Sequence, residues 1–304
     1  MDINYKDVID TILNKSDKYS YKLIHDKGTK VYLVEIDKPF IVRIAAGHEG
    51  KYKFDEELLE CIHEVDNLTA KVLYWEVREI NGEKLIVQVQ TYLPGIALNK
   101  YPNNLEKEAI VESTYKLHQR LCKVSNQFSS LGIPSVDKII EVMVGNATDC
   151  ILKKEAIKLL ENNRFKEIIV SNETFLCHGD LWPENILLEK KSDKAEVKFI
   201  DLDPVVYGPK DLQPAILFSS YFLLGSYLFN QLYEFDIDEL IKLWPEELNK
   251  NDILLLMLIF PIVIGLSKEM QFKSENNYEE EGYNQSLAPL LYSVNYIWKQ
   301  FDLI

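Results

Sequence analysis

The sequence predicts an α+β fold in two parts: a small part built on a five-stranded antiparallel sheet with one helix, and a larger, mainly helical part. Three observations lead to this prediction. Extended runs of β-branched and aromatic residues are concentrated in residues 1–93, one helical pattern interrupts them, and the pattern turns helical after a break at Tyr92–Gly95. The 304 residues, 47% hydrophobic and 27% charged, suffice for a sizeable core.

Three strands are expected near the start of the chain, because short extended runs there are separated by turn residues. The runs cover residues 20–25, 29–36 and 40–45, and the pairs Lys27-Gly28 and Asp37-Lys38 lie between them. This spacing predicts an antiparallel meander.

A helix and two further strands complete the predicted sheet. Residues 53–65 carry apolar positions at helical spacing, namely Leu58, Leu59 and Ile62. Residues 71–79 and 84–91 are typical of strands, and Asn81-Gly82 between them favours a type I′ hairpin turn. Apolar side chains of the second strand alternate with polar ones on its other face: Lys84, Gln88 and Gln90.

The break at Tyr92–Gly95 is expected to separate two domains, residues 1–93 and 94–304. In the second domain a short β segment, from Thr174 to about Leu202, interrupts the helical patterns. After Pro204 the chain is predicted to be helical to its end.

The charge balance argues against some classes of partner. The chain has 34 Lys and Arg residues against 48 Asp and Glu residues, a formal net charge of −14. Nucleic acids and anionic membranes repel such a protein, because they carry the same sign of charge. We therefore expect neither a nucleic-acid partner nor a membrane partner.

The cysteines and the apolar stretches indicate a cytoplasmic protein. The four cysteines lie far apart without a Cys-x-x-Cys pair, so neither a zinc site nor a disulfide framework is expected. The acidic N-terminal segment is not typical of a signal peptide. The apolar stretches 215–229 and 253–266 are interrupted or fall short of the roughly 18–20 residues of a membrane span, and both are expected to be core helices.

The most informative segments are His178–Leu187, HGDLWPENIL, and residues 199–203, FIDLD. Asp180 is expected on a loop between two short strands, with Asn185 five residues later, and Asp201 ends the next apolar strand. A carboxylate and an amide oxygen from adjacent strand ends suit Mg²⁺, which takes few protein ligands together with phosphate oxygens. Asp180 can then face a hydroxyl group that approaches the phosphate, as phosphoryl transfer requires.

These motifs resemble those of the aminoglycoside phosphotransferase and choline kinase superfamily, small-molecule kinases with a two-lobed, protein-kinase-like fold. The family pattern is H-G-D-x-x-x-x-N followed by a hydrophobic strand that ends in I-D. The matching residues are His178, Gly179, Asp180, Asn185 and Asp201. Supporting matches, similar to the family's hinge, leucine-histidine pair and G-x-x-D-L segment, are Tyr92–Gly95, Leu117-His118 and Gly208–Leu212. The resemblance implies that Asp180 is the catalytic base and that Asn185 and Asp201 hold Mg²⁺.

The resemblance also implies a phosphate-binding cation on the third strand, paired with a glutamate of the helix. Arg43 is the one cation of that strand, where family members carry lysine or arginine. Glu56 is the preferred partner, because it has the family's spacing and leaves Leu59 pointing to the core. Glu57 and Glu60 compete for this role.

The nucleobase is expected to lie against the hinge, where the resemblance suggests backbone groups of Thr91 and Leu93. The first hairpin has a single glycine, Gly28, and no G-x-G-x-x-G loop. Gly28 is therefore expected to serve as a turn residue whose backbone lies over the phosphates.

Four other residues near the motifs receive different assignments. His178 is expected to pack and to form hydrogen bonds within the loop, and His118 is expected to be structural. Trp182 is expected mainly to pack, with stacking on a ligand as the alternative. Asp203 is a second metal neighbour, a substrate contact or a solvent-exposed residue.

The expected reaction is transfer of the γ-phosphate of ATP or GTP to a hydroxyl group of a small molecule. From Pro204 to Ile304 the chain has six Lys and Arg residues against fourteen Asp and Glu residues, and an acidic pocket wall attracts cations. The substrate is therefore expected to be cationic and aminoglycoside-like. An acidic loop, Glu279, Glu280 and Glu281, is the candidate mobile part of that wall.

Two alternatives remain open beside the antibiotic kinase. One is a metabolite kinase of the choline, homoserine, thioribose or fructosamine type. The other is an inactive, nucleotide-binding pseudokinase, against which the presence of Asp180, Asn185 and Asp201 together counts.

Overall fold

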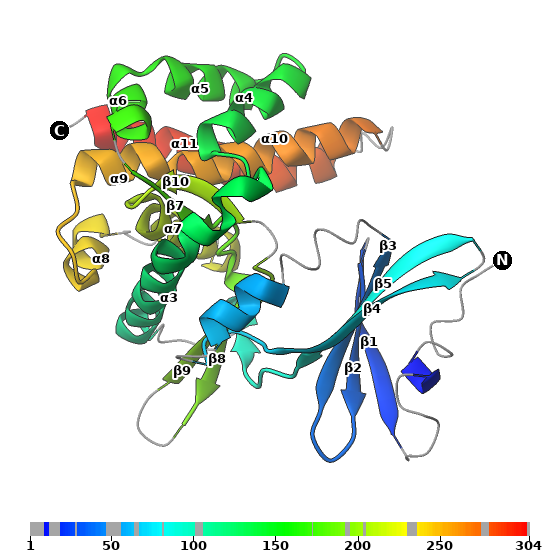
Figure 1. The fold of residues 1–304 in the computed structure, drawn as a ribbon. Helices are drawn as coiled ribbons and strands as arrows, with labels where there is room; N and C mark the ends of the chain where they lie inside the picture. The colour runs from blue at the N-terminus through cyan, green and yellow to red at the C-terminus, as the bar shows by residue number, and fades with distance from the viewer. Residues whose placement is uncertain are drawn as a thin grey trace. The chain divides into compact units, whose positions relative to one another are not determined.

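The structure is a computed structural model, and it divides into two compact units (Figure 1). The first comprises Met1–Gly95 and Lys198–Ile200, and the second comprises Ile96–Val197 and Asp201–Ile304. The described residues are 9–11, 19–27, 29–46, 56–63, 67–80, 82–100, 106–171, 173–191, 195–202, 205–229, 236–274 and 280–302. Each unit is described by itself below.

The first unit is built on a five-stranded antiparallel sheet with the strand order β1-β2-β3-β5-β4. The strands are β1 Ser20–Lys27, β2 Thr29–Glu35, β3 Phe40–Ala46, β4 Val72–Ile80 and β5 Glu83–Thr91. Residues 56–63, between β3 and β4, are helical, and residues 9–11 form a further helical turn. Gly82 has a φ of 83°, the left-handed conformation that a tight hairpin turn needs. The predicted sheet and its helix are confirmed.

One face of this sheet forms the core of the first unit. Alternate side chains of neighbouring strands point to the same face, so each strand contributes every second residue. The buried residues of this face, with Ile9 packed on them, are Tyr32, Val34, Phe40, Val42, Ile44, Leu85, Val87 and Val89. Removal of these apolar side chains from water is the main force that holds the sheet together.

The opposite face of the sheet is partly polar and is nevertheless buried. Ala45 and Ile86 form its small apolar cluster, with Trp75 packed against them. Gln88 and Gln90 lie on this face at 0% and 7% exposure, and the Gln90 amide donates to the Gln88 oxygen at 2.7 Å. The polar face that alternation predicts on β5 therefore faces the protein instead of solvent.

The second unit is mainly helical, as predicted (Figure 1). Its helices are α3 Lys107–Phe128, α4 Val136–Asn146, α5 Ile151–Glu161, α6 Asn163–Ser171, α7 Leu212–Phe229, α8 Ile237–Leu243, α9 Lys250–Met257, α10 Ile259–Ser274 and α11 Glu280–Asp302. In α3 the residues Ile110, Leu117 and Leu121 are fully buried, which matches their spacing on one helical face.

The second unit also contains two small sheets, and one of them has a strand directly after Pro204, where the sequence predicted only helix. One has two antiparallel strands, β7 Thr174–His178 and β10 Val205–Pro209. The other has three, β6 Ile96–Ala97, β8 Ile186–Lys190 and β9 Ala195–Phe199, with β8 in the middle. The loop that carries Asp180 therefore runs from the end of β7 to the start of β8.

The end of β9 contributes to the first unit, which no sequence pattern indicated. Lys198–Ile200 belongs to that unit by its contacts. The Phe199 N–H donates to the Leu68 carbonyl at 2.8 Å, and Thr69 forms a parallel bridge with Phe199. Phe199 is fully buried, so this short segment is part of the unit's packing.

Helices α9 and α10 together form one segment, Lys250–Ser274, that is long and apolar enough to cross a membrane by length and composition. The segment has 25 residues, and its most apolar 18-residue window has a mean hydropathy of 2.1. The expectation that the apolar stretch 253–266 falls short of a membrane span in length was therefore wrong. Within the most apolar part of this segment 72% of the residues are buried inside the fold. That is the burial of a core helix.

Candidate active site

The loop that carries Asp180 begins where β7 ends. β7 is a buried strand, Thr174–His178, whose last residue pairs with Val205 of β10. Gly179 and Asp180 follow, and a short 3₁₀ turn, Pro183–Asn185, leads into β8. The proline at the start of that turn has its φ already set for a helical turn and needs no N–H partner there.

Asp180 and Asn185 are brought together by this loop. The Asn185 side-chain nitrogen donates to the Asp180 carbonyl oxygen at 3.0 Å and to its carboxylate Oδ2 at 3.1 Å. Only the NH₂ end of the amide can donate to two oxygens, so these contacts define its orientation. The Asn185 Oδ1 atom is left at the opposite end of the amide, away from Asp180.

Asp201 is held in an unusual backbone conformation. Its φ is 57°, and among the described residues only Asn67 shares a positive φ without being glycine. A left-handed conformation costs a residue with a side chain roughly 1–3 kcal/mol and is typical of functional sites. The side chain of Asp201 is exposed to solvent.

The environment of Asp180 disfavours its charge. Burial raises the pKa of this carboxyl from 3.8 to about 6, and the negative charge of Asp201 raises it further in the same direction. Hydrogen bonds from Asn185 and from the Trp182 N–H oppose this rise in pKa. Asp180 and Asp201 are therefore close enough to interact, and the pKa of Asp180 suits a general base near neutral pH.

The donor set fits Mg²⁺ better than a metal held by protein side chains alone. Within the described residues no group of three or more His, Cys, Asp or Glu side chains forms a metal site. Asn185 and Asp201 offer an amide oxygen and a carboxylate, which are hard oxygen ligands. Mg²⁺ uses one or two such ligands together with waters and phosphate oxygens, so this sparse set fits it.

The two histidines near the motifs are buried structural residues. His178 is fully buried, and its Nδ1 accepts a hydrogen bond from the Asp180 N–H at 3.3 Å. His118 is 4% exposed and lies against Trp244 and Cys122, and its burial lowers its pKa to about 4. A histidine that remains neutral in the core does not serve as an acid near neutral pH.

Trp182 is in contact with a helix of the second unit. Its ring packs against Phe260 of α10 at a centroid distance of 5.9 Å. Two residues later, Glu184 is exposed and accepts a hydrogen bond from Asn99 at 2.9 Å. These contacts hold the outer part of the loop, and sequence reasoning did not single out Asn99.

Two residues of the second unit that the sequence did not single out hold β7 itself. Ser125 of α3 and Gln213 of α7 are buried and accept hydrogen bonds from backbone N–H groups of this strand. No local motif marks either residue, because each bonds to a partner far away in the sequence.

The residues expected to bind the nucleotide lie on the first unit. The strand register aligns Arg43 of β3 with Gln88 of β5, and Gln88 with Trp75 of β4. The Trp75 indole N–H donates to the Glu56 carboxylate of the helical residues 56–63. Residues directly opposite each other in neighbouring strands point to the same face of the sheet. Arg43 therefore lies on the same face as Trp75, two strands away from it, and Trp75 contacts the helix on that face.

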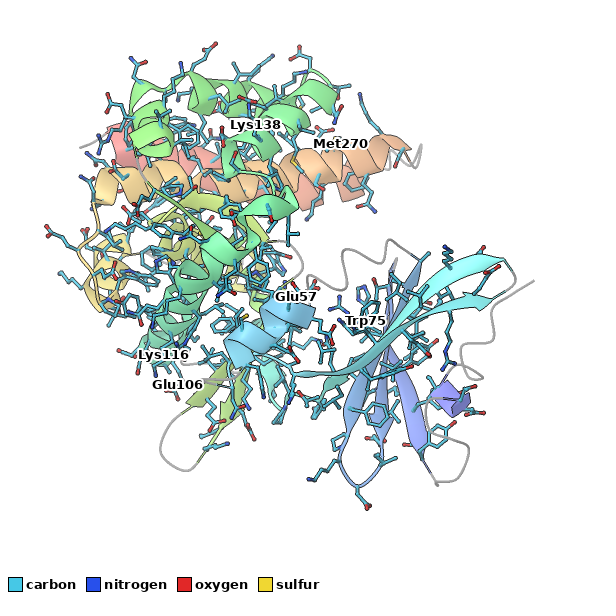
Figure 2. The ribbon with its side chains drawn as sticks, viewed as in Figure 1. Glu57, Trp75, Glu106, Lys116, Lys138 and Met270 are labelled. Carbon is cyan, nitrogen blue, oxygen red and sulfur yellow. The ribbon has the colours of Figure 1, made fainter. Side chains whose placement is uncertain are left out.

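The helix glutamates differ in their surroundings. Glu56 is half-buried and contacts the sheet through Trp75, whereas Glu57 and Glu60 are exposed to solvent. Figure 2 labels Trp75 on the sheet and Glu57 on the helix. Among the three, Glu56 is therefore the one directed toward the sheet that carries Arg43.

The hinge residues are only partly available to a ligand. The Thr91 N–H donates to the Lys71 carbonyl at 2.9 Å, and the Thr91 hydroxyl accepts from the Lys71 N–H at 2.9 Å. The sheet thus uses the Thr91 N–H, so this group is not available as a donor to a nucleobase. Leu93 follows β5 and is half-buried.

Several predicted site residues lie outside what the structure describes. Gly28, Asp203 and Glu279 are outside the described residues. Glu280 and Glu281 begin helix α11, so the expected acidic loop is wrong for these two residues.

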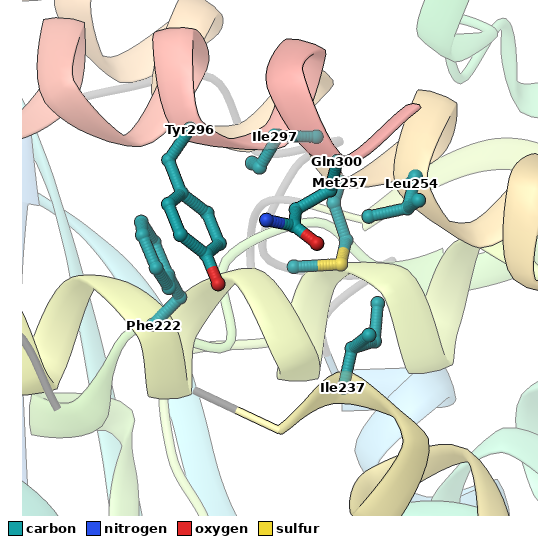
Figure 3. A pocket seen from close by; sticks show the side chains of 7 residues that line it. All are labelled: Phe222, Ile237, Leu254, Met257, Tyr296, Ile297 and Gln300. Carbon is teal, nitrogen blue, oxygen red and sulfur yellow. The ribbon is translucent and has the colours of Figure 1, made fainter. Parts of the chain in front are cut away.

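A small hollow in the second unit is separate from these residues. Apolar side chains of α7, α8, α9 and α11 line it, with Tyr296 and Gln300 as its polar members (Figure 3). Neither Asp180 nor Asn185 nor Asp201 lines this hollow.

Comparison with protein-family models identifies the chain. The model described as "Phosphotransferase enzyme family", APH, matches residues 22–210, which is more than half of the sequence. The chain belongs to this family. The predicted superfamily and the prediction of a phosphotransferase that acts on small molecules are confirmed at this level.

Solved structures share the kinase-like fold at low sequence identity. APH(2")-IIia, solved with GDP and kanamycin, has a TM-score of 0.70 and 13% identity over 96% of this chain and 98% of that one. The choline kinase LicA from Streptococcus pneumoniae has a TM-score of 0.60 and 14% identity over 96% and 99%. Spectinomycin phosphotransferase APH(9)-Ia, with ADP and spectinomycin, has a TM-score of 0.59 and 12% identity over 97% and 94%. No curated protein sequence matches the chain.

Proposed function

We propose that this phosphotransferase moves the γ-phosphate of ATP or GTP to a hydroxyl group of a small cationic molecule, with an aminoglycoside-like antibiotic as the leading candidate. The observation that carries the proposal is the pairing of Asp180 with Asn185 on one loop, beside an Asp201 held at positive φ. An inactive pseudokinase would have no need for this combination.

In the proposed reaction Asp180 orients the attacking hydroxyl group and accepts its proton. Its raised pKa, about 6, leaves it ionised and able to accept a proton at pH 7 and above. Its hydrogen bond from Asn185 fixes the carboxylate in one orientation. Positioning of the nucleophile is the main task of such a base in phosphoryl transfer.

Asn185 and Asp201 would hold Mg²⁺ in this proposal. The metal, when bound, neutralises charge on the phosphate oxygens. The exposed Asp201 carboxylate is the ligand that can reach phosphate-bound metal, and the Asn185 Oδ1 is the second oxygen.

The nucleotide is assigned to residues of the first unit. Arg43 would contact the α and β phosphates, with Glu56 as the carboxylate that supports it. The carbonyl of Thr91 and the backbone of Leu93 would contact the nucleobase. Nothing in these backbone contacts favours adenine over guanine.

The cationic substrate is inferred from charge. The stretch from Pro204 to Ile304 has eight more acidic than basic residues, fourteen against six. APH(2")-IIia was solved with kanamycin, which is an amine-bearing substrate, and LicA is a choline kinase. A metabolite kinase of the choline type is therefore the second candidate, and both candidates share a positive charge on the substrate.

The test is a coupled assay of ADP or GDP release with Mg²⁺ across aminoglycosides, other hydroxyl-bearing antibiotics and amino alcohols that include choline. We expect turnover with one cationic class and a KM that increases several-fold between low and high salt.

Replacing Glu279, Glu280 and Glu281 together with glutamine should raise the KM for the cationic substrate and leave the nucleotide KM unchanged. Turnover only with neutral or anionic compounds, without salt dependence, would refute the cationic substrate. Absence of turnover with every compound would refute the kinase.

A further inference from the structure

Among the described residues, strand β7, which leads into the catalytic loop, has a neighbouring strand on one side only. Its two-stranded sheet pairs it with β10. The other edge of a buried strand must still satisfy its N–H and C=O groups, because a buried backbone group without a partner is costly. In this protein side chains of two helices perform that task.

The two helices reach alternate residues of the strand. The Leu176 N–H donates to the Ser125 hydroxyl of α3 at 2.7 Å, and the His178 N–H donates to the Gln213 Oε1 of α7 at 2.8 Å. Leu176, His178 and Gln213 are fully buried, and Ser125 is 3% exposed. Residues two apart present their N–H groups on the same edge of a strand, so this is the pattern that a third strand would otherwise satisfy.

Gln213 lies within hydrogen-bonding distance of both the backbone N–H and the carbonyl of His178. Besides accepting from the His178 N–H, its Nε2 lies 3.5 Å from the His178 carbonyl oxygen, at the limit of a hydrogen bond. A side-chain amide has one donor and one acceptor, like a peptide group, and can therefore imitate a neighbouring strand. Ser125 takes the Leu176 N–H and donates to Leu121 within its own helix, so it makes no second contact with β7 by this hydroxyl.

His178 connects this anchor to Asp180. Its imidazole Nδ1 accepts from the Asp180 N–H at 3.3 Å, and Asp180 in turn is held by Asn185. Hydrogen bonds thus link Gln213 to the backbone of the buried His178, and the His178 imidazole to the backbone N–H of Asp180. Ser125 bonds to the strand two residues earlier and has no such connection.

We propose that Gln213 is a positioning residue for Asp180: its amide fixes His178 against α7 and so sets the place of the catalytic carboxylate. The inference rests on the proposed function of Asp180. It predicts that loss of the Gln213 amide affects the turnover step, whereas loss of the Ser125 hydroxyl affects stability alone.

The test compares Gln213→Met with Ser125→Ala. Both changes leave one buried N–H of β7 without its acceptor, so both should lower the unfolding temperature. Gln213→Met should lower kcat at least about tenfold and leave the nucleotide KM within about twofold, because a small displacement of a catalytic group affects turnover. Ser125→Ala should keep kcat within about twofold when it is measured well below its unfolding temperature.

Gln213→Asn serves if Gln213→Met does not fold. Its amide carries no charge and is one methylene shorter, so it no longer reaches both the N–H and the carbonyl of His178. We expect a loss in kcat larger than that of Ser125→Ala. Equal kcat in Gln213→Asn and the parent protein, or a kcat loss in Ser125→Ala as large as in the Gln213 variants, would overturn the inference.

A second measurement separates this inference from the proposed function. Hydrogen exchange of the nucleotide-free protein, followed in peptides that cover residues 178–185, does not depend on activity. Exchange there should be at least about tenfold faster in a Gln213 variant than in Ser125→Ala, because the loop opens locally. Equal exchange in the two variants would overturn the positioning role. A parent protein without turnover on any compound would refute the kinase, and the exchange data would still decide on Gln213.

Discussion

Replacing Asp180 with asparagine should make the folded chain more stable while phosphotransfer becomes far slower. The folded state raises the pKa of Asp180 from 3.8 to about 6, roughly two units. At about 1.36 kcal/mol per unit, the ionised carboxylate costs the folded state about 3 kcal/mol relative to its protonated form. Asparagine has almost the same shape and carries no charge, so it removes this cost.

The sign of the pH dependence follows from the direction of the shift. A carboxyl with a raised pKa binds its proton more tightly in the folded state than in the unfolded state. Its protonation therefore stabilises the fold, and this stabilisation is complete below pH 3.8. It is lost as the pH rises through about 6, where the folded protein must carry the buried charge. The gain from Asp180→Asn should therefore be full above pH 6 and absent below about pH 4.

The net gain in the free energy of unfolding from Asp180→Asn is smaller than the cost of the buried charge. Asp180 is only partly buried, and an amide offers one acceptor oxygen to the donors of Asn185 and Trp182 where the carboxylate offers two. A weakened hydrogen bond costs about 1 kcal/mol. We expect a gain of about 1–2 kcal/mol at pH 8, which raises the unfolding temperature of the second unit by a few degrees.

The assay is thermal unfolding in a chelator at pH 4 and pH 8, paired with phosphotransfer on a cognate substrate. Glu173→Gln is the control, because it removes an exposed charge just before β7 and should change stability little. Asp180→Asn should bind nucleotide normally and lose most of its turnover. No gain in stability at pH 8, or an equal gain at pH 4, would refute the burial argument, and turnover within about tenfold of the parent would refute the role as base.

Two further predictions concern the metal and the helix packing. Asp201→Ala should abolish the Mg²⁺ dependence of nucleotide binding in calorimetry, and retained dependence would remove this residue from the metal site. Gly265→Ala in α10 should lower the free energy of unfolding by about 1–3 kcal/mol, because a Cβ there would lie 2.3 Å from a Leu152 methyl group. Gly145→Ala in α4 has no heavy atom within 4 Å of its Cβ and should raise stability by about 0.5–1 kcal/mol; equal effects at the two sites in denaturant titrations would contradict the packing argument.

The sheet and the helices were predictable because their signals are local. Short runs of β-branched and aromatic residues, separated by turn residues, predict the strands of the first unit. Alternation identifies Val87 and Val89 as the core side of β5. Local alternation did not predict that the opposite side of β5 is buried as well. The burial of Gln88 and Gln90 depends on what packs on that face, and this information comes from distant parts of the chain.

The catalytic loop was predictable for a different reason. Asp180 and Asn185 are five residues apart on one loop, so their contact needs no long-range folding, and the reaction restricts each position to few residue types. The partner of Glu56 was not predictable in this way. In the structure Glu56 accepts a hydrogen bond from Trp75, a residue on another element whose indole was not among the candidates.

The supports of the catalytic loop are the hardest residues to find in a sequence. An acceptor for a strand N–H can be a serine, a glutamine or any other side chain with an oxygen, and it can come from any helix that packs nearby. In this protein Ser125 and Gln213 reach β7 across 51 and 35 residues of sequence. The proposed chemistry therefore confines Asp180 and Asn185 to a short motif, whereas geometry alone selects the residues that support their loop. For that reason a structure is needed to locate Gln213, although the sequence suffices to locate Asp180.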